Sequence, residues 1–270
     1  MKKILFVFFV LICISFETIS QELVKQYPVF KSGEKITYNA VYNWGFIWLK
    51  AGLVEFNVNE TNYFNEPAYH LIAAGASIPS YDWLFKVRDY YQSYTQKENL
   101  SPLFFSRNTY EGGYQVDNRF EFNYNDSVIS TKTKNTNKAY TEDSLIIKKK
   151  TYDVLSAVYL IRNIDFTHYA INDTIPVTVI IDNEIFDLYI RYLGKEIIKT
   201  HDRRKFHTLK FSALLVEGTI FKEGEDLFVW ITDDLNRIPV LVEAKILIGS
   251  IKATLNTTEN LKFNLSSEIK

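Results

Sequence analysis

Apolar and polar residues alternate along most of this chain, in short runs that are separated by turn residues. A period of two places the apolar side chains on one face of a β-strand, so the pattern is typical of half-buried antiparallel sheets. Because the runs follow one another in order, we expect neighbouring strands to pair. The predicted strands are residues 35–43, 47–58, 69–77, 87–96, 102–110, 114–124, 127–134, 175–182, 184–193, 195–200, 206–216, 226–232, 238–246 and 250–257.

One segment, residues 151–164, departs from this alternation. Its apolar positions recur at helical spacing, and they are Val154, Leu155, Val158 and Ile161. Thr151 or Asp153 provides a side-chain oxygen that can cap the first turn. The segment therefore predicts the main helix of the protein, and a shorter helical turn is expected at residues 80–85.

The pattern also predicts how strands are joined and what shape the sheet takes. Gly194 is expected to make a turn between two strands, and the polar stretch 132–143 is expected to be a mobile hairpin or loop. A sheet of about a dozen strands must curl or close to remove its edges. We predict a mainly β fold in which a curved antiparallel sheet or half-open barrel wraps around one amphipathic helix.

The first residues have the pattern of a secretory signal peptide. Lys2 and Lys3 precede a nearly unbroken apolar run over residues 4–16, and Thr18 and Ser20 supply small residues at the cleavage positions. Such a stretch directs export and is removed afterwards. We expect cleavage after Ser20 and a protein that is periplasmic or associated with the envelope.

Removal of this signal divides the chain into a signal peptide, residues 1–20, and one mainly β domain, residues 21–270. The only cysteine, Cys13, lies in the signal behind Ile12, which does not suit lipid attachment. The mature chain therefore has no disulfide and no thiolate site. No later run is long enough to cross a bilayer, so we expect no transmembrane helix in it.

Charge and composition narrow the classes of partner. The chain has 31 Lys and Arg against 32 Asp and Glu, a net charge of −1, so no strong field attracts nucleic acid. Aromatic residues make up 16% of the chain, which favours strands. The four histidines have no spacing typical of a metal site, and we expect neither metal nor cofactor.

Catalytic motifs such as Gly-x-Ser-x-Gly, a phosphate-binding glycine loop or His-Glu-x-x-His do not occur. The segment with Asp233, Asp234 and Arg237 permits two interpretations. Two carboxylates beside an arginine can perform acid–base chemistry, as in a hydrolase or transferase of the envelope. The same residues also form a good hairpin turn, in which Asp side chains accept backbone amides and Arg237 bridges a carboxylate. The turn is the favoured interpretation.

Aromatic residues at turns form a second candidate site. Trp44, Phe46 and Trp48 surround the first predicted turn, and Trp83 and Phe85 lie in the short helical segment. Aromatic side chains near the mouth of a half-barrel suit an apolar or sugar-like ligand. We expect Trp44, Trp48, Trp83 and Phe85 to contribute to ligand binding, although most aromatic residues of a β-protein form its core.

Several short segments together resemble a known family. They are residues 33–38 (GEKITY), Ala51-Gly52, residues 152–157 (YDVLSA) and the segment 217–255. In this order they resemble the exported bacterial family called domain of unknown function 3108, over nearly the whole mature chain. The resemblance implies a periplasmic or envelope location and a curved antiparallel sheet similar in outline to lipoprotein-carrier folds. It supplies no catalytic residues.

Three functional hypotheses follow. The first is a non-enzymatic envelope protein that holds a lipid, a glycan or a partner segment on the concave face of its sheet. The second is an envelope hydrolase or transferase that uses Asp233 and Asp234. The third is a structural or assembly factor that captures an envelope protein by adding a strand at a sheet edge.

Overall fold

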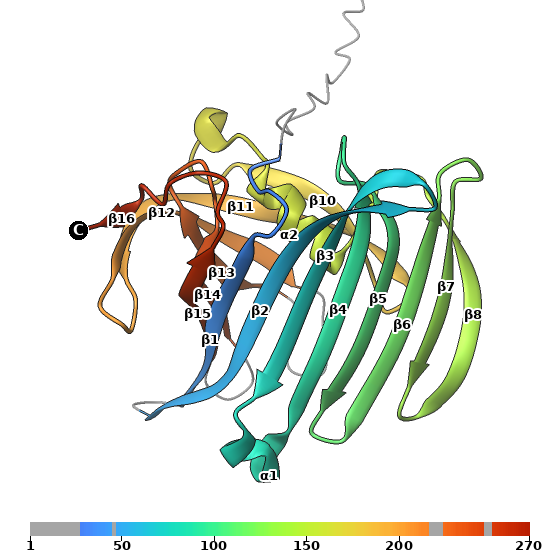
Figure 1. Cartoon of the computed structure of the whole chain (residues 1–270), viewed down its shortest axis with the longest axis horizontal. Coiled ribbons are helices and arrows are strands. Elements are labelled where there is room, and N and C mark those ends of the chain that lie inside the picture. Colours follow the sequence, from blue (N-terminus) through green and yellow to red (C-terminus); the bar gives the residue numbers. More distant parts are fainter. Residues whose placement is uncertain (1–27, 45–46, 216–223, 246–249) are drawn as a thin grey trace, which may run out of the picture.

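The computed structural model describes residues 28–44, 47–215, 224–245 and 250–270, and these form one long, curved sheet (Figure 1). The predicted signal peptide lies outside the described residues. The strands are β1 (Lys35–Trp44), β2 (Ile47–Tyr63), β3 (Glu66–Ser77), β4 (Val87–Gln96), β5 (Pro102–Glu111), β6 (Tyr114–Asn123), β7 (Val128–Asn135), β8 (Lys138–Ile146), β9 (Thr151–Asp153), β10 (Thr174–Ile181), β11 (Glu184–Lys199), β12 (Lys205–Leu215), β13 (Gly224–Thr232), β14 (Pro239–Lys245), β15 (Ser250–Glu259) and β16 (Glu268–Ile269). The helices are η1 (Pro79–Tyr81), α1 (Asp82–Phe85), α2 (Val154–Arg162) and η2 (Phe166–His168).

The strands follow the order β8-β7-β6-β5-β4-β3-β2-β1-β15-β14-β13-β12-β11-β10-β9, with β16 attached to β12. The two ends of this path, β8 and β9, do not pair, so the sheet is open and does not close into a barrel. Figure 1 shows β1–β8 as one broad arm, with the later strands curving behind it. The prediction of a mainly β, curved and half-open fold is therefore confirmed.

Pairing follows chain order in most of the sheet, as predicted. Two connections depart from this order. The first strand, β1, pairs with β15 and so joins the two halves of the sheet. The short strand β9 pairs with β10 in parallel, because α2 lies between them in the chain and carries it back to the same end.

α2 lies inside the curve and contacts β3 and β4 of one arm and β9 and β10 of the other. The Asp153 carboxylate caps its first turn and accepts the amides of Leu155 and Ser156, both at 2.9 Å. At the other end, the Asn163 side-chain amide donates to the Tyr159 carbonyl at 2.7 Å. Asp153 was one of the two predicted caps. None of the helices in the described ranges is long and apolar enough to cross a membrane.

The alternation of apolar and polar residues along the strands places the core on the inner face of the curved sheet. In β6, Phe120 and Phe122 are buried while Glu121 between them is exposed, which is the pattern of a sheet with one wet face. The largest buried cluster joins β2–β7 to α2, with Leu71 and Phe105 among its strand residues. The inner face of the sheet and the helix therefore pack against each other.

Of two local predictions, the turn at Gly194 was wrong, whereas the hairpin alternative for the stretch 132–143 was right. The expected turn at Gly194 is a β-bulge within one continuous strand, β11, and the pairing with β12 shifts between Tyr192 and Gly194. Gly194 has φ +104°, so glycine bends this strand without ending it. The polar stretch 132–143 is a regular hairpin of β7 and β8, because its polar side chains face solvent while its backbone pairs.

Candidate functional site

α2 presents one apolar stripe that the sheet covers only in part. Val154, Val158 and Ile161 follow one another at spacings of four and three residues, so they share one side of the helix. All three are partly buried, whereas Leu155 and Leu160, on the two flanks of the stripe, are buried. The space in front of this stripe is the candidate site.

A cavity of about 370 Å³ lies in this space, and we call it the inner cavity. Val158, Tyr159, Ile161 and Arg162 supply its helical wall. The sheet supplies the rest, from β1, β2 and β11–β15, and those residues are Ile36, Tyr38, Val54, Phe56, Ile190, Phe211, Ala213, Leu227, Val229, Ile231, Pro239, Val242 and Ala253. Nearly the whole wall is hydrocarbon, as in sites that bind apolar small molecules.

Small side chains leave this space open. Ala213 of β12 and Ala253 of β15 face the inner cavity at positions where neighbouring strands carry Leu227 and Val242. A larger side chain at either alanine would extend into the cavity. The sheet is therefore underfilled on this part of its inner face, in contrast to the packed cluster between β2–β7 and α2.

A smaller cavity of about 230 Å³ adjoins the first, and we call it the Asp89 cavity. The two cavities share Val54, Phe56 and Val158 in their walls. The remaining wall of the Asp89 cavity consists of Ala73, Ala74, Gly75, Asp89, Tyr91, Val154 and Leu155. A methyl group at Gly75 would lie 3.8 Å from the Asp89 Cβ atom, so this glycine leaves room beside the carboxyl.

Asp89 is the acidic residue in these walls, and its environment favours the neutral form. Burial raises the pKa of Asp89 to about 7, and the nearby Glu111 carboxylate acts in the same direction. The Tyr110 backbone amide and the Arg107 guanidinium lower the pKa only in part. The buried Oδ1 atom of Asp89 has no hydrogen-bond partner among the described protein atoms.

The other charged residue of the walls, Arg162, is fully paired. Its Nη1 and Nη2 atoms donate to the two carboxylate oxygens of Glu34 at 2.7 and 3.1 Å. Nη2 also donates to the Asn236 carbonyl at 3.2 Å, and the guanidinium stacks over the Tyr159 ring. Arg162 and Glu34 are 2% and 1% exposed, so the pair belongs to the buried frame of the cavity.

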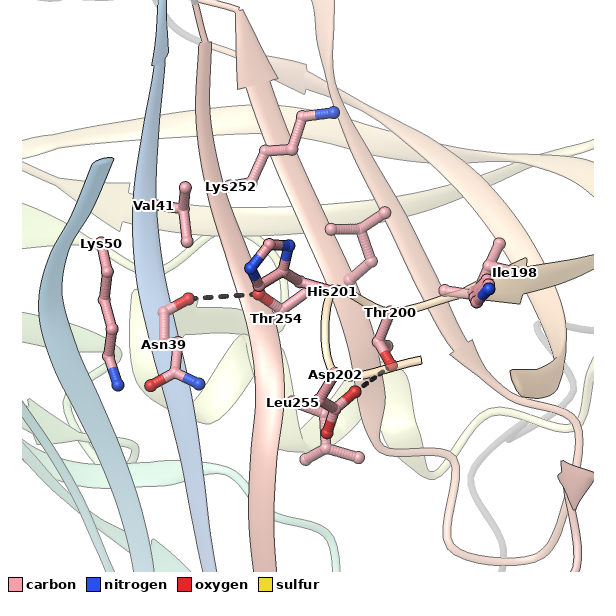
Figure 2. A pocket seen from close by; sticks show the side chains of 12 residues that line it. Asn39, Val41, Lys50, Ile198, Thr200, His201, Asp202, Lys252, Thr254 and Leu255 are labelled. Atoms are coloured by element: carbon pink, nitrogen blue, oxygen red, sulfur yellow. Dashed lines mark hydrogen bonds between the residues drawn. The ribbon is translucent and has the colours of Figure 1, made fainter. Parts of the chain in front are cut away.

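A different hollow, of about 560 Å³, lies on the outer face of β1, β14 and β15, beneath the turn between β11 and β12 (Figure 2). Asn39, Lys50, Lys252 and Thr254 point into it from the sheet, and His201 lies on the turn above. The Thr254 hydroxyl is 3.4 Å from the Asn39 carbonyl oxygen. Charged side chains line this hollow together with apolar ones such as Val41, Ile198 and Leu241, so its wall is mixed.

The predicted aromatic site residues lie at the edge of the structure. Trp83 and Phe85 belong to α1 between β3 and β4, and they are 82% and 55% exposed. Neither contributes to the walls of the inner cavity or the Asp89 cavity. Trp44 ends β1 and Trp48 lies near the start of β2, but their side chains lie outside the described residues, as does Phe46. Their roles in ligand binding stay predictions.

The Asp233, Asp234 and Arg237 segment forms the connection between β13 and β14. Asp234 accepts the Asn236 backbone amide at 2.9 Å, and Asp233 pairs with Lys195 at 2.8 Å. Arg237 donates to the Ile164 carbonyl and lies 3.5 Å from the Asp165 carboxylate. These contacts agree with the turn interpretation, and the acid–base hypothesis stays a prediction. In the described part of the chain, no group of three or more acidic or histidine side chains is arranged to hold a metal ion.

Asp89 and its cavity were not predicted from the sequence, although two signals point to them. Asp89 alternates with the inward-facing Tyr91 and Ser93 in β4, which places an acid among core positions. The facing strand β3 contains the small-residue run 73–76, which is unusual for a buried strand. An inward-facing acid opposite small residues indicates a polar group with open space beside it in an otherwise apolar wall.

Comparisons with known proteins place the chain in a family and support the fold. The family model described as "Protein of unknown function (DUF3108)" matches residues 37–256. The crystal structure of a β-barrel-like protein of domain of unknown function DUF1849 from Brucella abortus is similar, with a TM-score of 0.55 and 9% sequence identity, over 86% of this chain and 99% of that one. At this identity the similarity concerns the fold alone. No curated protein matches the sequence.

Proposed function

The chain belongs to the DUF3108 family, and from that membership and its cavities we propose that it is an exported envelope protein that binds a hydrophobic ligand beside α2. In this proposal the protein is a carrier or sensor and catalyses no reaction. The observation that carries it is the inner cavity, whose wall is hydrocarbon except for the paired Arg162. Each Å² of apolar surface that binding removes from water stabilises the complex by about 25 cal/mol. A hydrocarbon chain is therefore the occupant that such a wall favours.

A lipid chain fits the inner cavity better than a glycan or a protein segment does. Sugar hydroxyls and peptide groups that are buried without hydrogen-bond partners cost free energy. The Arg162 guanidinium already donates to Glu34 and Asn236, so it has little capacity left for such groups. The volume of about 370 Å³ lies within the range of small-molecule sites, roughly 300–1,000 Å³.

The location belongs to the same proposal. The predicted signal peptide would deliver the domain to the periplasm, where lipid components of the envelope must cross an aqueous space. N-terminal sequencing of the protein recovered from the periplasm should begin at Gln21. An unprocessed N-terminus on cytosolic protein would contradict the export part of the proposal.

Trp83 and Phe85 are proposed to act at the envelope surface. Indole and phenyl rings partition into the interfacial region of membranes. α1 joins β3 and β4, the strands that also carry Gly75 and Asp89 of the smaller cavity. Exposed rings there would bring this end of the protein to its lipid source.

The test fills the inner cavity from inside. In Ala213→Phe the added ring occupies space that a hydrocarbon chain would need, so binding of an environment-sensitive apolar dye should fall about tenfold or more. Native mass spectrometry of the protein purified from its host should show a bound lipid in the wild type and little in the variant. Ala253→Phe tests the same space from a different strand.

Ala139→Phe is the matched control, because this alanine is exposed on β8, outside the walls of both cavities. It should leave dye binding and the bound lipid unchanged. Circular dichroism and thermal melting confirm that all variants are folded. Equal dye binding by the wild type and both cavity variants, with no lipid in any sample, would contradict the proposed function.

One observation favours the assembly hypothesis as a second candidate. β8 ends the sheet, so its outer edge offers unpaired backbone groups over Lys138–Ile146. Its exposed Lys138, Glu142 and Asp143 oppose unspecific pairing. Crosslinking from a photoreactive residue at position 139 in the intact envelope would reveal a partner strand, whereas crosslinks only to lipid or to none would leave the ligand-binding proposal as the better one.

A further inference from the structure

The Asp89 cavity adds a polar end to an otherwise apolar space. It shares Val54, Phe56 and Val158 with the wall of the inner cavity, so the two cavities are neighbours on the same side of α2. Its own wall is apolar apart from Asp89 and Tyr91. An amphiphile that enters with its hydrocarbon chain in the inner cavity therefore places its polar end beside one carboxyl group.

The charges around Asp89 decide which polar end is favoured. Arg107 is the nearby cation, and it pairs with Asp182, to which Asn118 also donates at 3.1 Å, while the buried Nε atom of Arg107 has no hydrogen-bond partner among the described protein atoms. Glu111 adds a further carboxylate on β5. The neighbourhood therefore holds three carboxyl groups and one guanidinium, and its balance is negative.

One oxygen of the Asp89 carboxyl lacks a hydrogen-bond partner, although the Tyr110 backbone amide and the Glu111 side chain contact the carboxyl. Its Oδ1 atom is buried without a hydrogen bond, whereas the equally inward carboxylate of Asp153 accepts from Ser93 at 2.7 Å and from two backbone amides. Gly75 keeps the space beside Asp89 open. A buried acceptor of this kind is stabilised most by a charged donor.

We propose that the Asp89 cavity binds the ammonium group of an amphiphile whose hydrocarbon chain occupies the inner cavity. This inference rests on the proposed function and names the ligand class. The ammonium donates to the free Oδ1 atom and is attracted by Glu111, whereas a carboxylate or phosphate head would be repelled. A neutral hydroxyl head can donate one hydrogen bond but gains no attraction between charges.

Binding of the ammonium group is coupled to the release of a proton from Asp89. Asp89 titrates near neutral pH, so part of the free protein carries a proton on this carboxyl at pH 7. An ammonium prefers the ionised carboxylate, so its binding releases that proton and its affinity rises with pH across the pKa of Asp89. Glu111, Arg107, Asp182 and Tyr91 are the other titratable and charged groups near the same spot.

The experiment compares three probes of one chain length and three head groups: decylammonium, decanol and decanoate, each below its micellar concentration. Isothermal titration calorimetry with the wild-type protein at pH 7.5 should give decylammonium an affinity about tenfold above that of decanoate. Asp89→Asn should lose this preference and keep its affinity for decanol. Glu121→Gln, an exposed acid on β6, is the matched control and should change none of the three affinities.

A second measurement keeps the inference testable if Asp89→Asn does not fold. In the wild type, the affinity for decylammonium should rise several-fold between about pH 6 and about pH 8, while that for decanol stays constant, because an alkylammonium remains charged over this range. A flat profile for decylammonium would overturn the inference.

The outcomes separate this inference from the proposed function. Equal binding of the three probes, or tighter binding of decanoate, overturns the ammonium site but leaves a hydrophobic cavity. If folded Asp89→Asn still preferred decylammonium over decanoate, the ammonium site would also be overturned and the hydrophobic cavity would remain. Binding of no probe, together with no effect of Ala213→Phe on dye binding, overturns both.

Discussion

Two charged residues, Arg162 and Asp89, face the apolar space beside α2, and they differ in how fully they are paired. Arg162 is 2% exposed and makes a bidentate contact with Glu34, and a further hydrogen bond to the Asn236 carbonyl. Asp89 has one buried oxygen without a partner, and the charged groups near it are the Glu111 carboxylate and the Arg107 guanidinium. One charge is satisfied within the protein, and the other is not.

The difference separates a structural role from a ligand-binding role within one cavity. A fully paired buried charge gains nothing from a ligand, because its hydrogen bonds are already made. A buried group that lacks a partner raises the free energy of the unliganded protein, and a ligand that supplies the partner recovers this free energy. We therefore assign Arg162 to the frame of the cavity and Asp89 to ligand recognition.

The largest expected effect comes from breaking the satisfied pair. Glu34→Ala leaves the Arg162 guanidinium buried without a counter-charge, so the free energy of unfolding should fall by about 3–5 kcal/mol. Denaturation in urea, followed by tryptophan fluorescence, measures the loss. The double variant Glu34→Leu, Arg162→Met removes both charges and should recover most of it.

An exposed ion pair provides the control for this effect. Glu60 pairs with Lys97 at 2.9 Å on the surface, and Glu60→Gln should cost less than about 1 kcal/mol. If Glu34→Ala cost no more stability than Glu60→Gln, the Arg162–Glu34 pair would not stabilise the fold. The assignment of Arg162 to the frame of the cavity would then be wrong.

A smaller effect is expected at Asp153, the buried carboxylate whose oxygens all have partners. Asp153→Ala removes the cap of α2 and leaves the Ser93 hydroxyl without its acceptor, so stability should fall by about 2 kcal/mol. Asp153→Asn keeps an acceptor oxygen and should lose less. Because α2 forms one wall of both cavities, apolar dye binding should weaken together with stability in Asp153→Ala. Unchanged dye binding in that variant would mean that the helix does not form the site.

Most of the fold could be predicted from alternation, for a physical reason. A strand with one wet face and one buried face must alternate, and a helix that packs on both sides must follow a different period, so 87–96 and 151–164 were distinguishable locally. Gly194 could not be assigned, since positive φ is needed equally in a turn and in a bulge. The pairing of β1 with β15 depends on contacts across the whole chain, which no local pattern encodes.

The candidate site was less predictable, because a cavity depends on what is missing from a wall. The aromatic residues suggested a ligand, but Trp83 and Phe85 lie on the exposed α1, and the cavities owe their space to Ala213, Ala253 and Gly75. Small residues on distant strands form a cavity only when the sheet brings them together. Asp89 was visible as an inward acid, yet only its neighbours decide whether it is paired.

A further expected effect is the pH dependence of stability that Asp89 causes. Its pKa is raised in the folded protein to about 7, so the folded state holds a proton that the unfolded chain, with a pKa near 3.8, releases earlier. The folded state therefore binds more protons between these values, and stability falls as the pH rises from about 4 to about 7. Asp89→Asn carries no titrating group, so its free energy of unfolding relative to the wild type should increase over this window and level off above it.

Asp187→Asn is the control, and its pH dependence of stability should have the opposite sign. Hydrogen bonds from Lys149 and Thr178 lower the pKa of Asp187 in the folded protein. That variant should lose stability relative to the wild type as the pH rises through the acidic range. If Asp89→Asn instead behaved like Asp187→Asn in urea titrations at matched pH, the surroundings of Asp89 would favour its charged form, as those of Asp187 do, and its assignment to ligand recognition would be wrong.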